Sequence, residues 1–100
     1  MYAVIFRSTR TPDHSNLYGE WSEKMERLVV SQPGYQSHFS FRDGDTGDGV
    51  TVSYFDSEES ISQWRDLNEH LEAQTLGREH FYKGYTVEVA HIERRYEWHK

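Results

Sequence analysis

Residues 50–64 read VTVSYFDSEESISQW, and within this stretch the apolar pattern changes from that of a strand to that of a helix. Apolar and polar residues alternate from Val50 to Tyr54, as in a strand with one covered face. Asp56, followed three residues later by Glu59, fits the start of a helix. The next apolar residues recur at helical spacing: Ile61, Trp64, Leu67 and Leu71. The stretch therefore predicts a strand that leads directly into a helix.

A second strand and helix precede this stretch. Residues 2–9 are apolar or β-branched at successive positions, which predicts a strand covered on both faces. From Ser15 to Ser31 the large apolar residues again follow helical spacing: Leu17, Trp21, Met25 and Leu28. Gln32-Pro33-Gly34 should end that helix and turn the chain.

The remaining segments complete the order βαββαβ. Residues 35–43 alternate and should pair with 50–54 across the glycine-rich loop 44–49. The last strand is expected from about residue 85 to 96, and its apolar positions change parity, which indicates either a bulge or a change of environment. Gly77 should end or bend the second helix. This order predicts an α+β, ferredoxin-like fold with a four-stranded antiparallel sheet and helices on one face.

Composition narrows the possible functions. The chain has 100 residues, a net charge of −6 and no cysteine. That length predicts one domain over residues 1–100. The acidic balance argues against nucleic-acid and acidic-membrane partners, which need clustered positive charge. Without cysteine there is no disulfide, thiolate nucleophile or iron–sulfur cluster. Because no apolar run is long enough for a signal peptide or a membrane span, we expect a cytoplasmic protein.

Three specific binding sites fit the sequence poorly. An RNA recognition motif shares the element order but needs an aromatic signature on the third strand, which here reads GVTVSY over residues 49–54. The loop 44–49 breaks the calcium-loop pattern, since Gly47 and Asp48 stand where an acid and a glycine are required. The six histidines never occur at i, i+4 or as HxH, so we expect no metal site.

The alternation also predicts which side chains lie on the sheet face without helices. That face should carry the polar positions of the central hairpin: Gln36, His38, Ser40, Arg42, Thr51 and Ser53. It should also carry parts of the first and last strands, which are too apolar for plain solvent. A face-to-face homodimer about a two-fold axis would cover such a surface, and the long last strand could reach the partner.

Six large rings are expected between the helices and the sheet: Trp21, Phe39, Tyr54, Trp64, Phe81 and Tyr82. Taken singly, each ring is compatible with an ordinary core. Together, rings of this size rarely interdigitate without leaving a gap. With His70, a tyrosine hydroxyl and an indole N–H pointing into it, such a gap would bind a flat and mostly apolar ligand.

Nearly the whole chain resembles the antibiotic biosynthesis monooxygenase family. The resemblance rests on YAVIFRST at 2–9, QPGY at 32–35, VTVSYFDSEESISQW at 50–64 and GREHFYKGYTVEVAHIERRY at 77–96. It implies a dimeric α+β barrel whose sheets pack face to face. Well-studied members oxygenate polycyclic phenols without metal, flavin or other cofactor, because the ionised substrate itself reduces dioxygen.

The resemblance assigns Trp64 directly, and the other candidate site residues are chosen by their positions around the predicted gap. Trp64 matches the family's helix tryptophan and would position a small aromatic or quinol-like substrate. His70 would take or donate a proton, and Tyr54 or Tyr82 would stabilise oxyanion charge. The substrate would lie against the remaining rings: Trp21, Phe39 and Phe81.

The same resemblance leaves two other functions to consider. A haem-degrading branch uses an asparagine on the first strand and a histidine later on the second helix. Here the first strand offers Phe6, Arg7 and Ser8, and the later position falls near Gln74, so haem degradation is disfavoured. A non-catalytic small-molecule-binding or stress-response protein with the same cavity stays open as the alternative.

Overall fold

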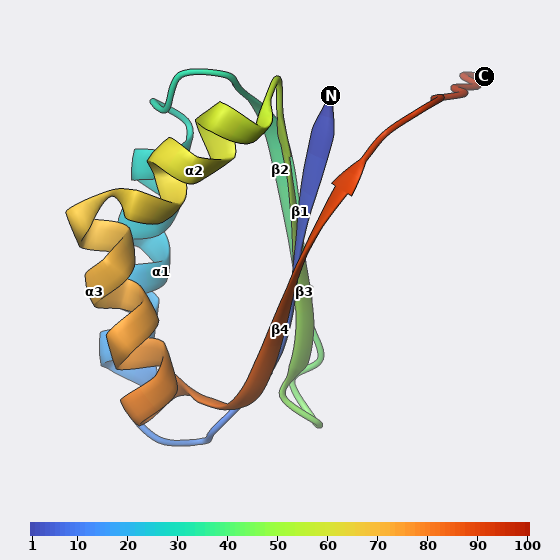
Figure 1. Ribbon diagram of the computed structural model, residues 1–100. Coiled ribbons are helices and arrows are strands. Elements are labelled where there is room, and N and C mark those ends of the chain that lie inside the picture. The colour runs from blue at the N-terminus through green and yellow to red at the C-terminus, as the bar shows by residue number, and fades with distance from the viewer.

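Helices cover one face of an antiparallel sheet in the computed structural model, which describes residues 1–67 and 70–100 (Figure 1). The elements in chain order are β1 (Tyr2–Arg10), α1 (Ser15–Val29), β2 (Tyr35–Arg42), β3 (Asp48–Phe55), α2 (Glu58–Asp66), α3 (Asn68–Leu76), the π-helical turn η1 (Gly77–Phe81) and β4 (Tyr82–His91). The strands lie in the order β2-β3-β1-β4, and all neighbours are antiparallel. The predicted ferredoxin-like α+β fold is confirmed.

Two glycine turns fix the hairpin and its connection to α1. Gly47, in the loop between β2 and β3, has φ 80°, and the Asp43 carboxylate accepts hydrogen bonds from the backbone N–H of the loop. Gly34 has φ 81°, and its carbonyl accepts a bond of 2.8 Å from the Asp56 N–H. A positive φ is easily adopted only by glycine, so both turns are encoded locally.

The second helical region differs in detail from the expectation. Its N-cap is Ser57 rather than Asp56, since the Ser57 hydroxyl accepts from the Ser60 N–H at 3.1 Å. Leu67 has an extended backbone, with φ −62° and ψ 134°, and divides the predicted single helix into α2 and α3. The α-helix ends at Leu76 with Gly77 as its C-cap, as predicted, and the right-handed backbone of Gly77 continues into η1.

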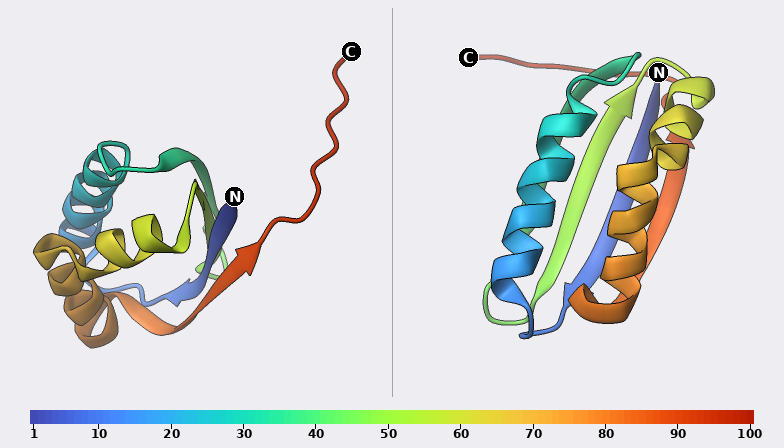
Figure 2. Two further views of the ribbon diagram at one scale, coloured as in Figure 1. Left: turned by 45° about the horizontal axis from the view of Figure 1, so that its top comes forward. Right: turned by 90° about the vertical axis from the view of Figure 1, so that its left-hand side faces the viewer.

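The last strand is shorter than predicted and starts earlier. β4 pairs regularly with β1 from Tyr85 to His91, so of the two predicted alternatives the bulge is absent there, while the environment changes after His91, where the strand ends. The register shift lies at the other end, between Thr9 and Arg10 of β1. Residues 92–100 leave the domain as an extended tail (Figure 2). Tyr96 and Trp98 on this tail are 86% and 80% exposed.

The two faces of the β2–β3 hairpin are the reverse of those predicted. Phe55 is fully buried against Val29 and Ile61, which are both helical, so the side of the sheet that carries Phe55 faces the helices. Because side chains alternate along a strand, the polar residues in phase with Phe55 share this inner face: His38, Ser40, Arg42, Thr51 and Ser53. The outer face carries the apolar residues: Ala3, Ile5, Phe39, Phe41, Val50, Val52 and Tyr54.

A bulge explains the reversal in β2, and in β3 the buried Phe55 sets the phase. The register shifts between Tyr35 and Ser37, where Gln36 is the extra residue. An inserted residue changes the side on which all later residues lie. Tyr35 therefore shares the inner face with His38 rather than with Phe39.

Candidate functional site

The inner face of the sheet is polar on the β2–β3 hairpin, whereas on β1 and β4 the residues in phase with Phe55 are apolar, among them Val4, Phe6, Val87 and Val89. The buried core cluster is confined to one end of the sheet and consists of Val29, Phe55 and Ile61. Phe81 is buried separately on η1. Between them the inner face presents hydroxyl and imidazole groups that are only partly buried, such as those of Thr51, Ser53 and His38. Such a surface can hydrogen-bond a ligand, which a packed apolar core cannot do.

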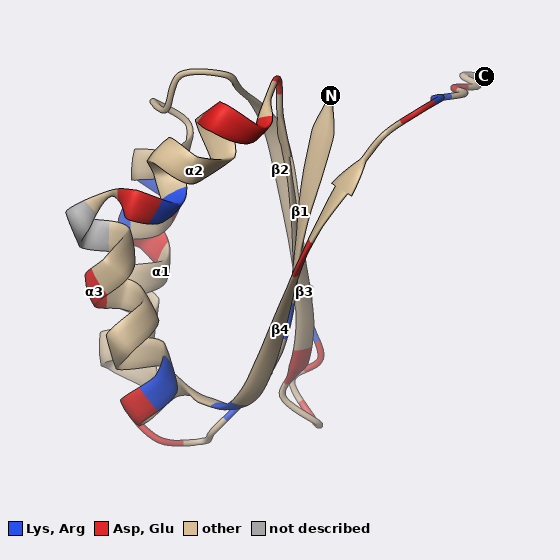
Figure 3. Cartoon of the chain, viewed as in Figure 1, with Lys and Arg blue, Asp and Glu red and all other residues tan. Residues whose placement is uncertain are grey.

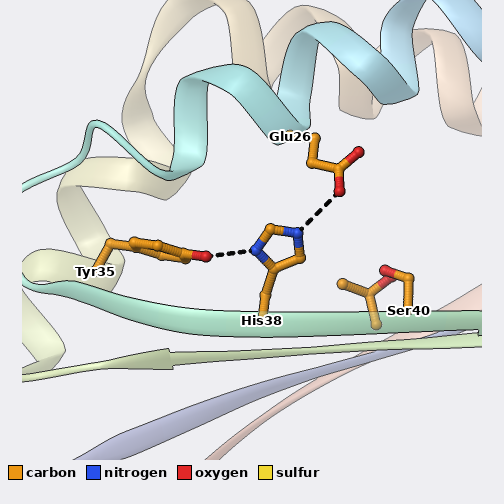
Figure 4. A network of polar contacts seen from close by, with 5 residues as sticks. Glu26, Tyr35, His38 and Ser40 are labelled. Carbon is orange, nitrogen blue, oxygen red and sulfur yellow. Dashed lines mark hydrogen bonds and ion pairs between the residues drawn. The ribbon is translucent and has the colours of Figure 1, made fainter.

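His38 is the centre of a hydrogen-bonded network on this inner face (Figure 4). Its Nδ1 lies 2.6 Å from the Tyr35 hydroxyl, and its Nε2 lies 3.3 Å from the carboxylate of Glu26 on α1. An ionised Glu26 accepts from Nε2–H, which leaves Nδ1 to accept from the Tyr35 hydroxyl. The His38 side chain is 15% exposed, so the network is sheltered but reachable.

Two hydroxyl groups lie beside this network. The Ser40 and Thr51 hydroxyls face each other across the two strands at 2.7 Å. Each can act as a donor or an acceptor. Figure 4 shows Ser40 on the same side of β2 as His38, so the inner face offers polar groups of both residues to a polar substituent of a ligand.

Trp64 and His70 come together at the junction of α2 and α3. Their rings stack with centroids 4.4 Å apart and an interplanar angle of 27°. Trp64 also packs against the core cluster. Burial lowers the pKa of His70 below its ordinary value of 6.5, and a hydrogen bond to the Arg65 carbonyl only partly opposes this. His70 is therefore neutral at pH 7 and can accept a proton.

Tyr82 and Phe81 lie where η1 passes into β4. The Tyr82 ring meets Tyr18 of α1 and Phe6 of β1 edge to face, with centroids 6.1 and 5.4 Å apart. Burial raises the pKa of Tyr82 above its ordinary value, and the neighbouring Tyr18 raises it further. The Tyr82 hydroxyl therefore stays protonated at neutral pH and can donate a hydrogen bond.

Two of the predicted site residues lie on the outer face. Phe39 and Tyr54 point away from the helices on the outer face, so the prediction that they line the inner space was wrong. Trp21 lies about 80° around α1 from the buried Val29, at about 100° per residue. Its ring is covered by the ammonium group of Lys24 at 4.6 Å.

The sequence did not lead us to predict His38, Tyr35 or Glu26 as residues of the site. A signal for them was present: Phe55 is large, apolar and in phase with the polar Thr51 and Ser53. Had this phase been used, the polar side of the hairpin would have been placed under the helices.

Two shallow hollows lie on the outer face. One, of about 400 Å³, is lined by Ser37, Phe39, Tyr54, Ile92 and Arg95. The other, also about 400 Å³, is lined mainly by outward-facing residues: Arg7, Thr9, Asp48 and Thr86. Neither corresponds to the ring-lined hollow predicted beneath the helices.

The described part of the chain shows neither a metal site nor a membrane helix. Within residues 1–67 and 70–100, no three His, Asp or Glu side chains are grouped so that they could hold a metal ion. No helix formed by these residues has the length and apolar character to cross a bilayer.

Comparisons with known proteins identify relatives over almost the whole chain. A family model described as antibiotic biosynthesis monooxygenase matches residues 1–76. The chain is 43% identical over 94 residues to the uncharacterized protein YqjZ of Bacillus subtilis (strain 168), covering 94% of this chain and 81% of that protein.

Solved structures share the fold at lower sequence identity. Rv0793 from Mycobacterium tuberculosis matches with a TM-score of 0.82 at 19% identity, covering 96% of this chain and 98% of that one. A mutant of SnoaB, a cofactor-independent oxygenase from Streptomyces nogalater, matches with a TM-score of 0.78 at 13% identity, covering 94% of each chain. At such identities these likenesses show the fold alone.

Proposed function

The chain belongs to the antibiotic biosynthesis monooxygenase family, and from this premise we propose that it is a cofactor-independent monooxygenase of a small phenolic or quinol-like molecule. The observation that carries the proposal is the inner face of the sheet, where His38, Thr51 and Ser53 stand in place of a packed core. A proton acceptor and a proton donor, His70 and Tyr82, lie on the elements that follow β3.

The proposed chemistry needs a general base, a hydrogen-bond donor and an aromatic surface that is shielded from water. A neutral histidine removes a proton of the substrate, the hydroxyl proton of a quinol or a proton of the methylene carbon of an anthrone, and the electron-rich anion then reduces dioxygen. In an anthrone, one oxygen atom enters the ring carbon as a ketone, and the other leaves as water with the two hydrogens of that carbon. The substrate supplies all the electrons, so no cofactor is required.

Each residue has a distinct part in this proposal. Trp64 offers a flat apolar surface against which the substrate ring lies, and His70, stacked on it, accepts the proton. Tyr82 donates a hydrogen bond to the oxygen that becomes negative. The alternative, a non-catalytic binding protein, uses the same surface without turnover.

Oxygen uptake with a panel of anthrones and quinols tests the proposal. We expect turnover above buffer in protein freed of metal and flavin. His70→Ala should lower the rate by about 100-fold, the usual minimum for losing a general base, and Tyr82→Phe by a similar factor. Because the pKa of His70 lies below 6.5, the rate should be constant from pH 8 to 7 and fall only in more acidic buffer.

Tyr54→Phe is the matched control, since it removes the same hydroxyl from the outer face. It should leave the rate unchanged. Absence of turnover with every compound, combined with measurable binding, would favour the non-catalytic alternative. Turnover that is insensitive to both His70→Ala and Tyr82→Phe would refute the proposed site.

We further propose that the outer face is covered by a second copy of the chain. Phe41 and Phe39 on this face are 71% and 43% exposed. Arg7 and Glu88, the charged pair in its middle, neutralise each other at 3.3 Å, and the strands otherwise carry few charges (Figure 3). An apolar, self-neutralised face is complementary to itself about a two-fold axis.

The tail supports the same pairing. Residues 92–100 project beyond the sheet with Tyr96 and Trp98 exposed (Figures 1 and 2). Large rings on an extended segment need a surface to cover them, and the outer face of a partner offers hollows of about 400 Å³. The tail of one copy would thus lie on the other.

A further inference from the structure

Two arginines converge on the tyrosine cluster at the end of the inner space near η1. The guanidinium carbon of Arg10 lies 3.8 Å from the centre of the Tyr18 ring, and that of Arg42 lies 5.9 Å from it. The Arg42 carbon is also 5.8 Å from the centre of the Tyr82 ring. Both arginines are only partly buried, so solvent or a ligand can reach them.

Backbone oxygens hold the two side chains in place. Arg10 donates to the Phe81 carbonyl at 2.9 Å. Arg42 donates to the Gly47 carbonyl at 2.7 Å and to the Ser8 hydroxyl at 2.8 Å. These neutral acceptors orient the guanidinium groups without cancelling their charge. A planar guanidinium has five N–H donors, so each arginine keeps N–H groups for another partner.

No carboxylate among residues 1–67 and 70–100 forms an ion pair with either arginine. The two acidic residues nearest in the hairpin loop have other partners. Asp43 accepts from backbone N–H groups of its own loop, and Asp48 accepts from the Thr9 hydroxyl at 2.7 Å. The chain has a net charge of −6, yet neither guanidinium group has a carboxylate partner among the described residues. Two oriented guanidinium groups of this kind can bind an anion.

We propose that Arg10 and Arg42 bind the negatively charged oxygen of the ligand, which is therefore held as an ionised phenol. The aromatic part of the ligand lies toward the inner face, and the oxygen receives charge-assisted hydrogen bonds from the guanidinium groups. Tyr82, which keeps its proton, adds a neutral donor beside them. This inference rests on the proposed function and specifies the charge state of its ligand.

The test uses 4-nitrophenol, whose ionised form absorbs visible light, and its uncharged methyl ether, 4-nitroanisole. We expect the apparent pKa of bound 4-nitrophenol to fall by about one unit, because the ionised form binds about tenfold more tightly than the neutral form. In Arg10→Met this shift should be largely lost. In Arg42→Lys, which keeps the charge but not the planar fork, part of it should remain.

Arg65→Met is the matched control, because Arg65 is exposed and pairs with Asp66 at 3.1 Å. It should keep the full shift, and 4-nitroanisole should bind equally to all these proteins. Binding of 4-nitroanisole without any shift of 4-nitrophenol in the unaltered protein would overturn the arginine site and leave the proposed function intact. A full shift in Arg10→Met would do the same. Failure of both probes to bind would overturn the aromatic site as well.

Discussion

Val52→Glu is expected to break the proposed dimer into monomers of 11.9 kDa. Val52 lies near the centre of the outer face, paired with Ile5 on one side and Phe39 on the other. About a two-fold axis, the substitution places two unpaired carboxylates in a buried apolar interface. An uncompensated buried charge costs about 3–5 kcal/mol, so the dimer affinity should fall by more than about 100-fold.

Light scattering during size-exclusion chromatography, at several protein concentrations, measures this change directly. Val30→Glu is the control, since Val30 is 51% exposed, follows α1 and lies off the outer face. It should remain dimeric. A monomeric mass for the unaltered protein at micromolar concentration would refute the interface, and so would a folded Val52→Glu protein that stays dimeric.

Gly34→Ala should lower the free energy of unfolding by about 2–4 kcal/mol, the sum of a strained φ and a steric overlap. Gly34 has φ 81°, which a residue with a Cβ adopts only with strain. An added Cβ would also lie 2.1 Å from the hydroxyl oxygen of Ser60, which is buried at the start of α2. The turn and the helix that carries Trp64 should therefore be destabilised together.

Urea denaturation at a fixed protein concentration measures the loss, and two variants separate its causes. Gly19→Ala, in α1, meets no atom within 4 Å and should stabilise the protein by about 0.5–1 kcal/mol. Adding Ser60→Gly to Gly34→Ala should recover the steric part and leave the backbone part. An unchanged midpoint in Gly34→Ala would contradict the tight contact between the turn and α2.

The element order could be predicted because its signals are local. Alternation in 50–54, helical spacing before Gly34 and the glycines of the 44–49 loop each specify one element without long-range information. The four antiparallel strands and the helices on one face then follow from βαββαβ order.

The facing of the hairpin could not be predicted in the same way. In β2 it depends on one extra residue at Gln36, which no periodicity of the neighbouring residues marks as a bulge, and in β3 it follows the phase of Phe55 rather than that of the alternating residues 50–54. The error placed Phe39 and Tyr54 in the predicted site and left His38 out of it. The stacking of His70 on Trp64 likewise depends on the break at Leu67, a backbone feature without a glycine or proline signal.

The proximity of Arg10 and Arg42 could not be predicted from the sequence for a related reason. Arg10 and Arg42 lie far apart in the chain and meet only because β1 and β2 flank β3 and end beside η1. Sequence spacing predicts contacts within an element, whereas this cluster depends on the register between elements. Residues of this kind are found from the structure.

The central claim is that the ligand binds on the inner face of the sheet, while the outer face belongs to the partner subunit. Methyl NMR spectra recorded during a titration with 4-nitroanisole test it most directly, because Thr51 and Val52 are neighbours on opposite faces. The account predicts ring-current shifts for the methyl groups of Thr51 and Val4, with those of Val52 and Ile5 unchanged. Shifts confined to Val52 and Ile5 would place the ligand on the outer face and contradict the account.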